Sequence, residues 1–357
     1  MDLPMKLEFW TAMDPSPQRA AGFSEWAETA GWDGIAFYDS QNLDGDCYVA
    51  LALAAAATQH LGISTGVTNP LTRHPAVAAS AIASIQQVSG GRAVLGIGRG
   101  DSALAYVGHA PVHIEVFKRY IEAVQTYLRG EAVSFDDLTY WQQMAPRVET
   151  LQLADTPEDS RLVWLTPEDK KVPVEVVATG PRVIAAASRH ADHVMFALGA
   201  DTERVKWGLE EARSARREAG LDPNGIKFGV YLNVVCHPRL DVARELLSEL
   251  DTFARFSVMN GKTFGPLARG EQDVLTGLHR SYDMRDDGSD RFRPPAEFVD
   301  RFAIVGPPDT CIGRIKELAD LGIEKVVVIG PTVGEQTGEA ARASELMARE
   351  VLPAFSG

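Results

Sequence analysis

The chain has 357 residues, 45% of them hydrophobic, and a formal net charge of −14. This charge argues against a general nucleic-acid or anionic-membrane binder, because both need a basic face. No segment approaches the ~20 apolar residues of a membrane span, and the cysteines Cys47, Cys236 and Cys311 form neither a zinc spacing nor a disulfide framework. We therefore expect a soluble globular protein in a reducing cytoplasm.

The first part of the chain alternates short apolar runs with helical patterns. Each apolar run ends in polar or glycine residues, and each helical pattern carries apolar side chains at a spacing of three to four. We expect strands at 6–13, 33–38, 61–66 and 92–97, and helices at 18–30, 48–60, 75–88 and 113–129.

The second part resumes this alternation after a long interruption. We expect strands at 174–178, 193–197, 227–236 and 325–329, and helices at 181–190, 202–219, 240–258, 307–321 and 335–351. Two stretches break the rhythm: 130–172, which is acidic with prolines, and 259–301, which we interpret as irregular and rich in glycine, aspartate and arginine. Such long connections usually form a lid, an interface segment or a small hairpin.

The repeated strand-helix order predicts the fold. Consecutive strands joined by helices form parallel sheets with right-handed crossovers. Eight strands in this order fit a (β/α)8 TIM barrel better than an open sheet. We expect one barrel domain over residues 1–357, with the two stretches as insertions that shape substrate access or a dimer contact.

Two neighbouring strand ends are the most informative part of the sequence. The third strand ends at Gly66 and is followed by Val67, Thr68 and Asn69, and the fourth is followed by Gly98 to Asp101. Ligands of parallel α/β folds lie at the carboxyl ends of strands, and glycine lets backbone amides approach a ligand closely. The two ends therefore indicate one shared binding site.

The same residues identify a family. The chain resembles the bacterial luciferase-like superfamily, and most closely its branch that uses the deazaflavin coenzyme F420, as in methylenetetrahydromethanopterin reductase. The resemblance extends over nearly the whole chain, including residues 302–355. Its motifs are TGVTNPLTRHP at 65–75, SGGR at 89–92, GIGRGD at 96–101, ATGPR at 178–182 and ADH at 191–193.

The resemblance implies a role for the end of the third strand. F420-dependent relatives carry a cis peptide bond at the position of Gly66 and Val67, and this bulge backs the central ring of the deazaflavin and holds it bent. Thr68 and Asn69 follow it and join the expected cofactor contacts. The alternative is an ordinary strand end before a turn at Asn69-Pro70.

Asp39 and Ser40 follow the second strand, where a barrel collects active-site side chains. Relatives that oxidise alcohols or sugar phosphates carry an acid/base histidine at the position of Ser40, and its absence argues against that route. Asp39 is left as a catalytic candidate that hydrogen-bonds the ring or substrate, together with Ser40 as a cofactor contact. Asp39 could instead form an Asx turn or cap a helix.

Two further groups complete the predicted site. Backbone amides at Gly98, Arg99 and Gly100 can bind polar edges of the cofactor, while Asp101 acts on the substrate or caps a helix. Gly180, Pro181 and Arg182 have the pattern of an anion cradle at a helix start, although Arg182 could be a plain surface cation. The resemblance assigns the cofactor phosphate to Ala178, Thr179, Gly180, Pro181, Arg182, Leu198, Gly199 and Ala200.

These features together predict an F420-dependent oxidoreductase. No metal-ligand spacing or nucleophile elbow is present, and His74 is interpreted as structural. The methanopterin reductases have a glutamate near the end of the first strand where this chain has Ala12 or its neighbour, so we leave the small organic substrate open. The alternatives are an FMN-dependent monooxygenase, whose frequent tryptophan is replaced by Asp101-Ser102-Ala103, and a non-catalytic flavin-binding barrel. The family commonly forms dimers, and we expect a homodimer.

Overall fold

A computed structural model describes residues 7–138, 144–247, 250–259, 261–284, 292–332 and 337–355. Eight parallel strands close into a barrel, because each pairs with the next and the last returns to the first. The predicted TIM barrel is therefore confirmed. The strands are β1 (Glu8–Met13), β2 (Gly34–Phe37), β3 (Gly62–Thr65), β4 (Ala93–Ile97), β5 (Val174–Ala178), β6 (His193–Phe196), β7 (Lys227–Cys236) and β11 (Lys325–Ile329).

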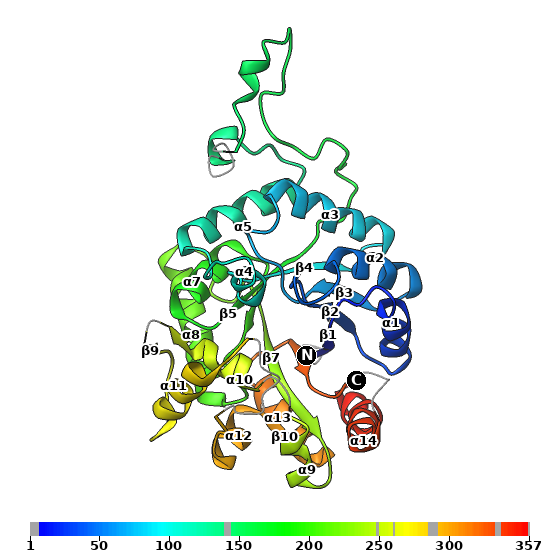
Figure 1. The fold of residues 1–357 in the computed structure, drawn as a ribbon, viewed down its shortest axis with the longest axis vertical. Coiled ribbons are helices and arrows are strands. Elements are labelled where there is room, and N and C mark those ends of the chain that lie inside the picture. Colours follow the sequence, from blue (N-terminus) through cyan, green and yellow to red (C-terminus); the bar gives the residue numbers. More distant parts are fainter. Residues whose placement is uncertain are drawn as a thin grey trace.

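Helices follow the strands and cover the outside of the barrel (Figure 1). In α5, Phe117, Ile121, Val124 and Leu128 are buried along one stripe, as a helix packed against a sheet requires. The outer helices are α1 (Ala20–Thr29), α2 (Cys47–Ala57), α3 (Pro75–Val88), α5 (Ile114–Leu128), α7 (Pro181–His190), α8 (Thr202–Glu218), α13 (Pro308–Ala319) and α14 (Gly338–Leu346). The chain continues after α14 as a π-helical turn (Met347–Val351) and a 3-10 turn (Leu352–Phe355).

The predicted boundaries agree closely with these elements. β5, β7, β11, α3 and α7 begin and end at the predicted residues. The expected starts of the first strand at residue 6 and of the last helix at residue 335 lie outside the described residues.

A charged cluster closes the barrel interior near the amino ends of the strands. Lys325 Nζ lies 2.9 Å from both carboxylate oxygens of Glu175 and 3.4 Å from the centre of a Trp10 ring. His193 Nδ1 lies 2.8 Å from the same carboxylate. Burial alone would raise the pKa of Glu175, but Lys325 and His193 lower it to about 2. Glu175 is therefore an ionised, fully paired structural group.

The first interruption, 130–172, leaves the barrel beside α5 and forms an arm. Val133 and Ser160 pair as an antiparallel bridge at its base, and the described residues beyond include two 3-10 turns, Phe135–Leu138 and Val148–Leu151. Figure 1 shows this green segment projecting beyond α3 and α5, away from the barrel.

The second interruption contains more regular structure than we predicted. The expectation of an irregular segment is wrong for α11 (Glu271–Ser281) and α12 (Ala296–Phe302), and a small antiparallel pair forms from β8 (Val258–Met259) and β9 (Lys262–Thr263). The short strand β10 (Ile304–Gly306) then pairs with the end of β7.

The single long helix predicted at 240–258 is also wrong. The described residues form α9 (Leu240–Glu245), α10 (Leu250–Ala254) and a 3-10 turn (Arg255–Ser257) that leads into β8. Two side-chain contacts explain why α10 gives way to the 3-10 turn after Ala254. Arg255 pairs with Asp101, and Ser257 Oγ accepts a hydrogen bond from Arg204 Nη2 at 2.9 Å. Tertiary contacts here override a continuous helical pattern.

None of the helices in the described ranges is both long enough and apolar enough to cross a membrane.

Candidate active site

The ends of β3 and β4 form a tightly packed shelf. The Gly66-Val67 peptide bond is cis, as the resemblance implied. Thr68 N–H donates to Gly96 O at 3.0 Å, and Gly98 N–H donates to Thr68 O at 2.9 Å, so the loop is fixed to β4. A Cβ added at Gly98 would lie 3.1 Å from Val67 Cγ2. We call Gly66, Val67 and Gly98 the Val67 shelf.

Asp39 lies beside this shelf and is almost completely buried. Its Oδ2 accepts hydrogen bonds from Thr68 Oγ1 at 2.6 Å and from Arg73 Nη1 at 2.5 Å. The helix-cap interpretation of Asp39 is wrong, because Asp46 is the residue that caps α2, accepting from the N–H groups of Tyr48 and Val49. Asp39 Oδ2 is thus held between a hydroxyl and a guanidinium.

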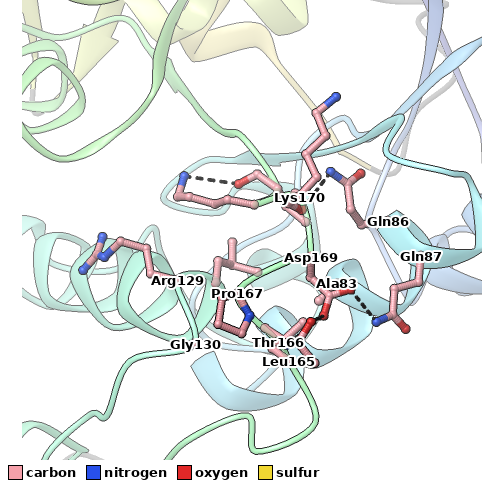
Figure 2. Close-up of a pocket in the computed structure, with 13 residues that line it drawn as sticks. Ala83, Gln86, Gln87, Arg129, Gly130, Leu165, Thr166, Pro167, Asp169 and Lys170 are labelled. Atoms are coloured by element: carbon pink, nitrogen blue, oxygen red, sulfur yellow. Dashed lines mark hydrogen bonds between the residues drawn. The ribbon is translucent and has the colours of Figure 1, made fainter.

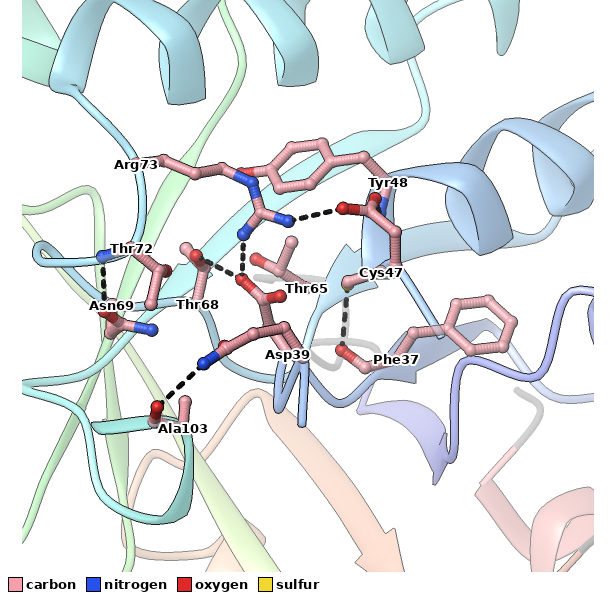
Figure 3. A network of polar contacts seen from close by, with 12 residues as sticks. Phe37, Asp39, Cys47, Tyr48, Thr65, Thr68, Asn69, Thr72, Arg73 and Ala103 are labelled. Atoms are coloured by element: carbon pink, nitrogen blue, oxygen red, sulfur yellow. Dashed lines mark hydrogen bonds and ion pairs between the residues drawn. The ribbon is translucent and has the colours of Figure 1, made fainter. Parts of the chain in front are cut away.

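Arg73 connects several parts of the site (Figure 3). Its second nitrogen donates to Asp46 Oδ2 at 2.8 Å, and its guanidinium lies 4.5 Å from the centre of the Tyr48 ring. The sequence motif contains Arg73, but no feature of the sequence alone assigned it a role. The neighbouring His74 accepts from Ala76 N–H at the start of α3, which confirms its structural interpretation.

The loops after β2 and β4 meet at the rim of the barrel. Ser40 Oγ lies 2.9 Å from Ser102 Oγ, and Gln41 Nε2 donates to Ala103 O at 2.9 Å. Ser102 begins the short helix α4 (Ser102–Ala105). The structure therefore brings the predicted residue Ser40 close to the segment that follows Gly100 and Asp101.

Asp101 is paired with a residue that sequence analysis missed. Its carboxylate contacts Arg255 Nη2, and it makes no side-chain hydrogen bond as a cap of α4, so the capping interpretation is wrong. The Arg255 guanidinium lies 4.0 Å from the ring centre of Tyr282 and 4.7 Å from that of Phe256. Asp101 thus binds the turn that leads into the second interruption to the end of β4.

Arg99 is held by backbone oxygens beside the same rim. Its Nε donates to Val112 O at 2.7 Å, and its Nη1 lies 3.7 Å from Met259 Sδ. Burial and the nearby charge of Arg182 both lower the pKa of Arg99. These two arginines therefore place positive charge near the predicted anion cradle.

The two predicted phosphate-binding ends differ in how open they are. Gly180 precedes α7 without a side-chain cap, and Pro181 is the first helical residue, so the helix start keeps the predicted cradle geometry. At the other end, Ala200 N–H already donates to Phe302 O at 2.7 Å, and Leu198 O accepts from Arg204 Nε at 3.0 Å. The arrangement favours the β5 end over the β6 end for an anion.

Unpaired buried polar atoms concentrate beside the Val67 shelf. Among the described residues, eight buried side-chain N or O atoms have no hydrogen-bond partner, and four of them belong to residues of this network. Such atoms are rare in folded proteins and call for a ligand or water. Those four are Asp39 Oδ1, Tyr48 OH, Asn69 Nδ2 and Thr72 Oγ1.

These atoms fit the polar edge of a flavin or deazaflavin. Asp39 Oδ1 is an acceptor and Asn69 Nδ2 is a donor, and the pyrimidine edge of either ring offers N–H and C=O groups. Asn69 is already oriented, since its Oδ1 accepts from the backbone N–H groups of Leu71 and Thr72. The residues present therefore suit such a cofactor.

A cavity of about 250 Å³ lies elsewhere, against the carboxyl ends of α3 and α5 (Figure 2). Helices of the barrel end where the strands begin, so this cavity is on the opposite face from the shelf. Its polar groups have partners: Lys170 Nζ donates to Gly91 O at 3.0 Å, Lys171 Nζ to Asp192 Oδ2 at 2.6 Å, and Gln87 Nε2 to Asp169 Oδ1 at 2.9 Å. We do not assign the reaction to it.

Comparisons with known proteins identify the family of this chain. The profile of the family described as luciferase-like monooxygenase matches residues 5–325. The 5,10-methylenetetrahydromethanopterin reductase of Methanolobus tindarius is 26% identical over 354 residues, which cover 94% of this chain and 95% of that protein.

Solved structures share the fold. An F420-dependent secondary alcohol dehydrogenase, solved with an F420-acetone adduct, aligns with a TM-score of 0.70 at 18% identity, covering 98% of this chain and 99% of that one. The oxygenating component of 3,6-diketocamphane monooxygenase from Pseudomonas putida, solved with FMN, aligns with a TM-score of 0.64 at 19% identity, covering 98% and 99%.

Proposed function

The chain belongs to the luciferase-like monooxygenase family, and we propose that it is an F420-dependent oxidoreductase within that family. In this proposal a hydride moves between C5 of the deazaflavin and a small organic substrate that carries a C=C, C=N or similar bond. The full-length similarity to a methylenetetrahydromethanopterin reductase supports the choice of branch.

We further propose that the barrel works as one domain with insertions at 130–172 and 259–301. We place it in the cytoplasm, where its three free cysteines would remain reduced.

The observation that carries the proposal is the Val67 shelf with unpaired polar atoms beside it. The shelf offers a rigid apolar surface for a flat ring, and Asp39 Oδ1 and Asn69 Nδ2 offer an acceptor and a donor for its edge. Gly180 and the nearby Arg99 and Arg182 would receive the phosphate. A bound reduced deazaflavin would supply the hydride.

The chain itself would orient the reactants and manage one proton. Fixing a ring against the shelf converts binding energy into rate by orientation. The paired hydroxyls of Ser40 and Ser102, at the rim, can donate a hydrogen bond to a substrate heteroatom. With its carboxylate bound to Arg255, Asp101 would hold the turn that leads into the insertion at 259–301 and so help to place that insertion beside the substrate.

An FMN-dependent monooxygenase is the second candidate. The FMN-bound diketocamphane enzyme has the same fold, and the pyrimidine edge that fits Asp39 and Asn69 is common to FMN and F420. FMN and F420 differ in the ring and in the chain attached to it, so measuring how tightly the protein binds each one separates the two candidates. We expect F420 to bind with a dissociation constant of about 1 μM, some tenfold or more tighter than FMN, a difference of about 1.4 kcal/mol per tenfold.

We also propose that the protein is a homodimer that pairs through α2 and α3. Neither helix contains a charged residue, although the chain carries a net charge of −14. Their outer faces expose apolar side chains, and the two helices lie side by side on the barrel (Figure 1). An uncharged apolar face can meet a second copy without like-charge repulsion. The exposed residues are Val49, Leu53, Val77 and Val88.

A further inference from the structure

Arg73 makes several contacts at the candidate site, more than an ordinary surface arginine needs. Its side chain is only 15% exposed and donates to two carboxylates, Asp39 at 2.5 Å and Asp46 at 2.8 Å. Its guanidinium also stacks over Tyr48, and its backbone oxygen accepts from Tyr120 OH at 3.0 Å. Arg73 is therefore fixed at once from the loop after β2, from the start of α2 and from α5.

The two carboxylates differ in how much they depend on Arg73. Asp46 is half exposed, and its Oδ1 is already occupied as the cap of α2. The Asp39 side chain is 1% exposed, and Arg73 is the cation that the structure pairs with it. A buried carboxylate without a cation is strongly disfavoured in its charged form. Removing Arg73 would therefore affect Asp39 far more than Asp46.

Asp39 transmits this contact to the shelf. A single oxygen, Oδ2, accepts from both Arg73 and Thr68, while Oδ1 is left buried and unpaired. Thr68 is in turn bound through its backbone to Gly96 and Gly98. In Figure 3, Arg73, Asp39 and Thr68 form one continuous set of contacts. The orientation of Asp39 thus links Arg73 to the residues against which a ring would lie.

We propose that Arg73 is a positioning residue of the cofactor site, which holds Asp39 so that Oδ2 braces Thr68 and Oδ1 faces an N–H of the bound ring. This inference rests on the proposed function, because it assigns the unpaired oxygen to the cofactor. It gives Arg73 no direct contact with the reacting atoms. A purely structural Arg73 would instead serve to anchor α2 through Asp46.

Asp46→Asn is the matched control for that structural role. Asparagine caps helices about as well as aspartate, so the variant keeps the cap of α2 and loses only the ion pair with Arg73. We expect it to bind F420 within about twofold of the unsubstituted protein. Arg73→Met removes the contact to Asp39 as well, and we expect F420 binding about tenfold to a hundredfold weaker, which corresponds to losing a hydrogen bond to a charged group.

A double-variant comparison separates positioning from structure. If Arg73 acts through Asp39, then Asp39→Asn and Arg73→Met should weaken F420 binding by similar factors, and Asp39→Asn/Arg73→Met should be little worse than either. The double variant should also recover part of any stability lost in Arg73→Met, because it no longer buries a carboxylate without a cation.

The experiment is a fluorescence titration of F420 into each purified variant, with the emission spectrum of the bound ring recorded. The proposal predicts weak binding and a shifted spectrum for the variants that lack Arg73 or Asp39, and neither change for Asp46→Asn. If Arg73→Met binds with the affinity and spectrum of the unsubstituted protein, the role of Arg73 is overturned while the proposed function stands. If the unsubstituted protein fails to bind F420, the proposed function itself fails, and this inference with it.

A fallback variant is needed in case Arg73→Met does not fold. Arg73→Lys keeps the charge, but a single ammonium cannot bind both carboxylates with the planar geometry of a guanidinium. We expect its F420 affinity to fall several-fold, with Asp46→Asn unchanged. Equal affinities for these two variants would contradict the proposal.

Discussion

The Cβ of any side chain at position 98 would lie 3.1 Å from Val67 Cγ2, closer than side chains normally pack. Gly98→Val should therefore displace Val67 and disturb the shelf, with a loss of about 1–3 kcal/mol of unfolding free energy from overpacking. We expect F420 affinity to fall at least tenfold, measured by fluorescence titration.

Gly313→Ala is the control for this substitution. Gly313 is in α13, where an added Cβ meets nothing within 4 Å, so alanine should raise stability by about 0.5–1 kcal/mol and leave F420 affinity unchanged. If Gly98→Val binds F420 as tightly as Gly313→Ala, the shelf is not where the ring lies.

Glu175→Gln tests the charged cluster inside the barrel. The substitution leaves Lys325 buried with no full counter-charge, and breaking such a pair typically lowers unfolding free energy by about 3–5 kcal/mol. Urea unfolding monitored by circular dichroism measures the loss. Equal urea midpoints for Glu175→Gln and the unsubstituted protein at pH 7 would contradict the claim that Glu175 stabilises the fold by pairing with Lys325.

The same cluster predicts how stability depends on acid. The pKa of Glu175 is about 2 in the folded protein and about 4.5 when unperturbed, so its contribution is present above pH 4.5 and is lost as the pH falls toward 2. Urea midpoints measured over this interval should fall less steeply for Glu175→Gln. If the urea midpoints of Glu175→Gln and the unsubstituted protein fall in parallel with pH, this account of Glu175 is contradicted.

Asp101→Asn distinguishes a proton-transfer role from the docking role that its contact suggests. If Asp101 holds the turn before the second interruption through Arg255, then Asp101→Asn and Arg255→Met should lower turnover by similar factors, and the double variant should be little worse than either. Steady-state rates for the three variants provide the measurement. A loss of turnover confined to Asp101→Asn would instead assign it acid/base chemistry.

Leu53→Glu and Val77→Glu test the proposed dimer. Each places a charge on the uncharged face of α2 and α3, and burying unpaired charges in an interface is strongly unfavourable. Analytical ultracentrifugation should show a shift from dimer to monomer. Leu240→Glu, an equally exposed leucine at the start of α9, should leave the mass unchanged.

The barrel could be predicted from sequence because its signals are local. Most strands are short apolar runs, and the helices that start at Pro75 and Pro181 carry proline at the first helical position, which marks where they begin. The strand ends could also be predicted, since Gly66 and Gly98 follow apolar runs that must be neighbours in a parallel barrel.

The contacts that complete the site could not be predicted in the same way. Arg255 is 154 residues from Asp101 in the sequence, in a segment where the helical pattern extended past the true end of the helix. Arg73 was visible in the motif, but its two partners come from another strand end and another helix start. Such pairings depend on tertiary structure, which neither periodicity nor residue spacing encodes.

The central claim is that the Val67 shelf holds a deazaflavin, and a competitive titration tests it most directly. Purified protein is titrated with F420 and, separately, with FMN, and each complex is then challenged with the other cofactor. We predict that F420 binds with a dissociation constant of about 1 μM and displaces FMN, and that Gly98→Val weakens this binding at least tenfold. Tight binding of FMN that F420 cannot displace would contradict the account.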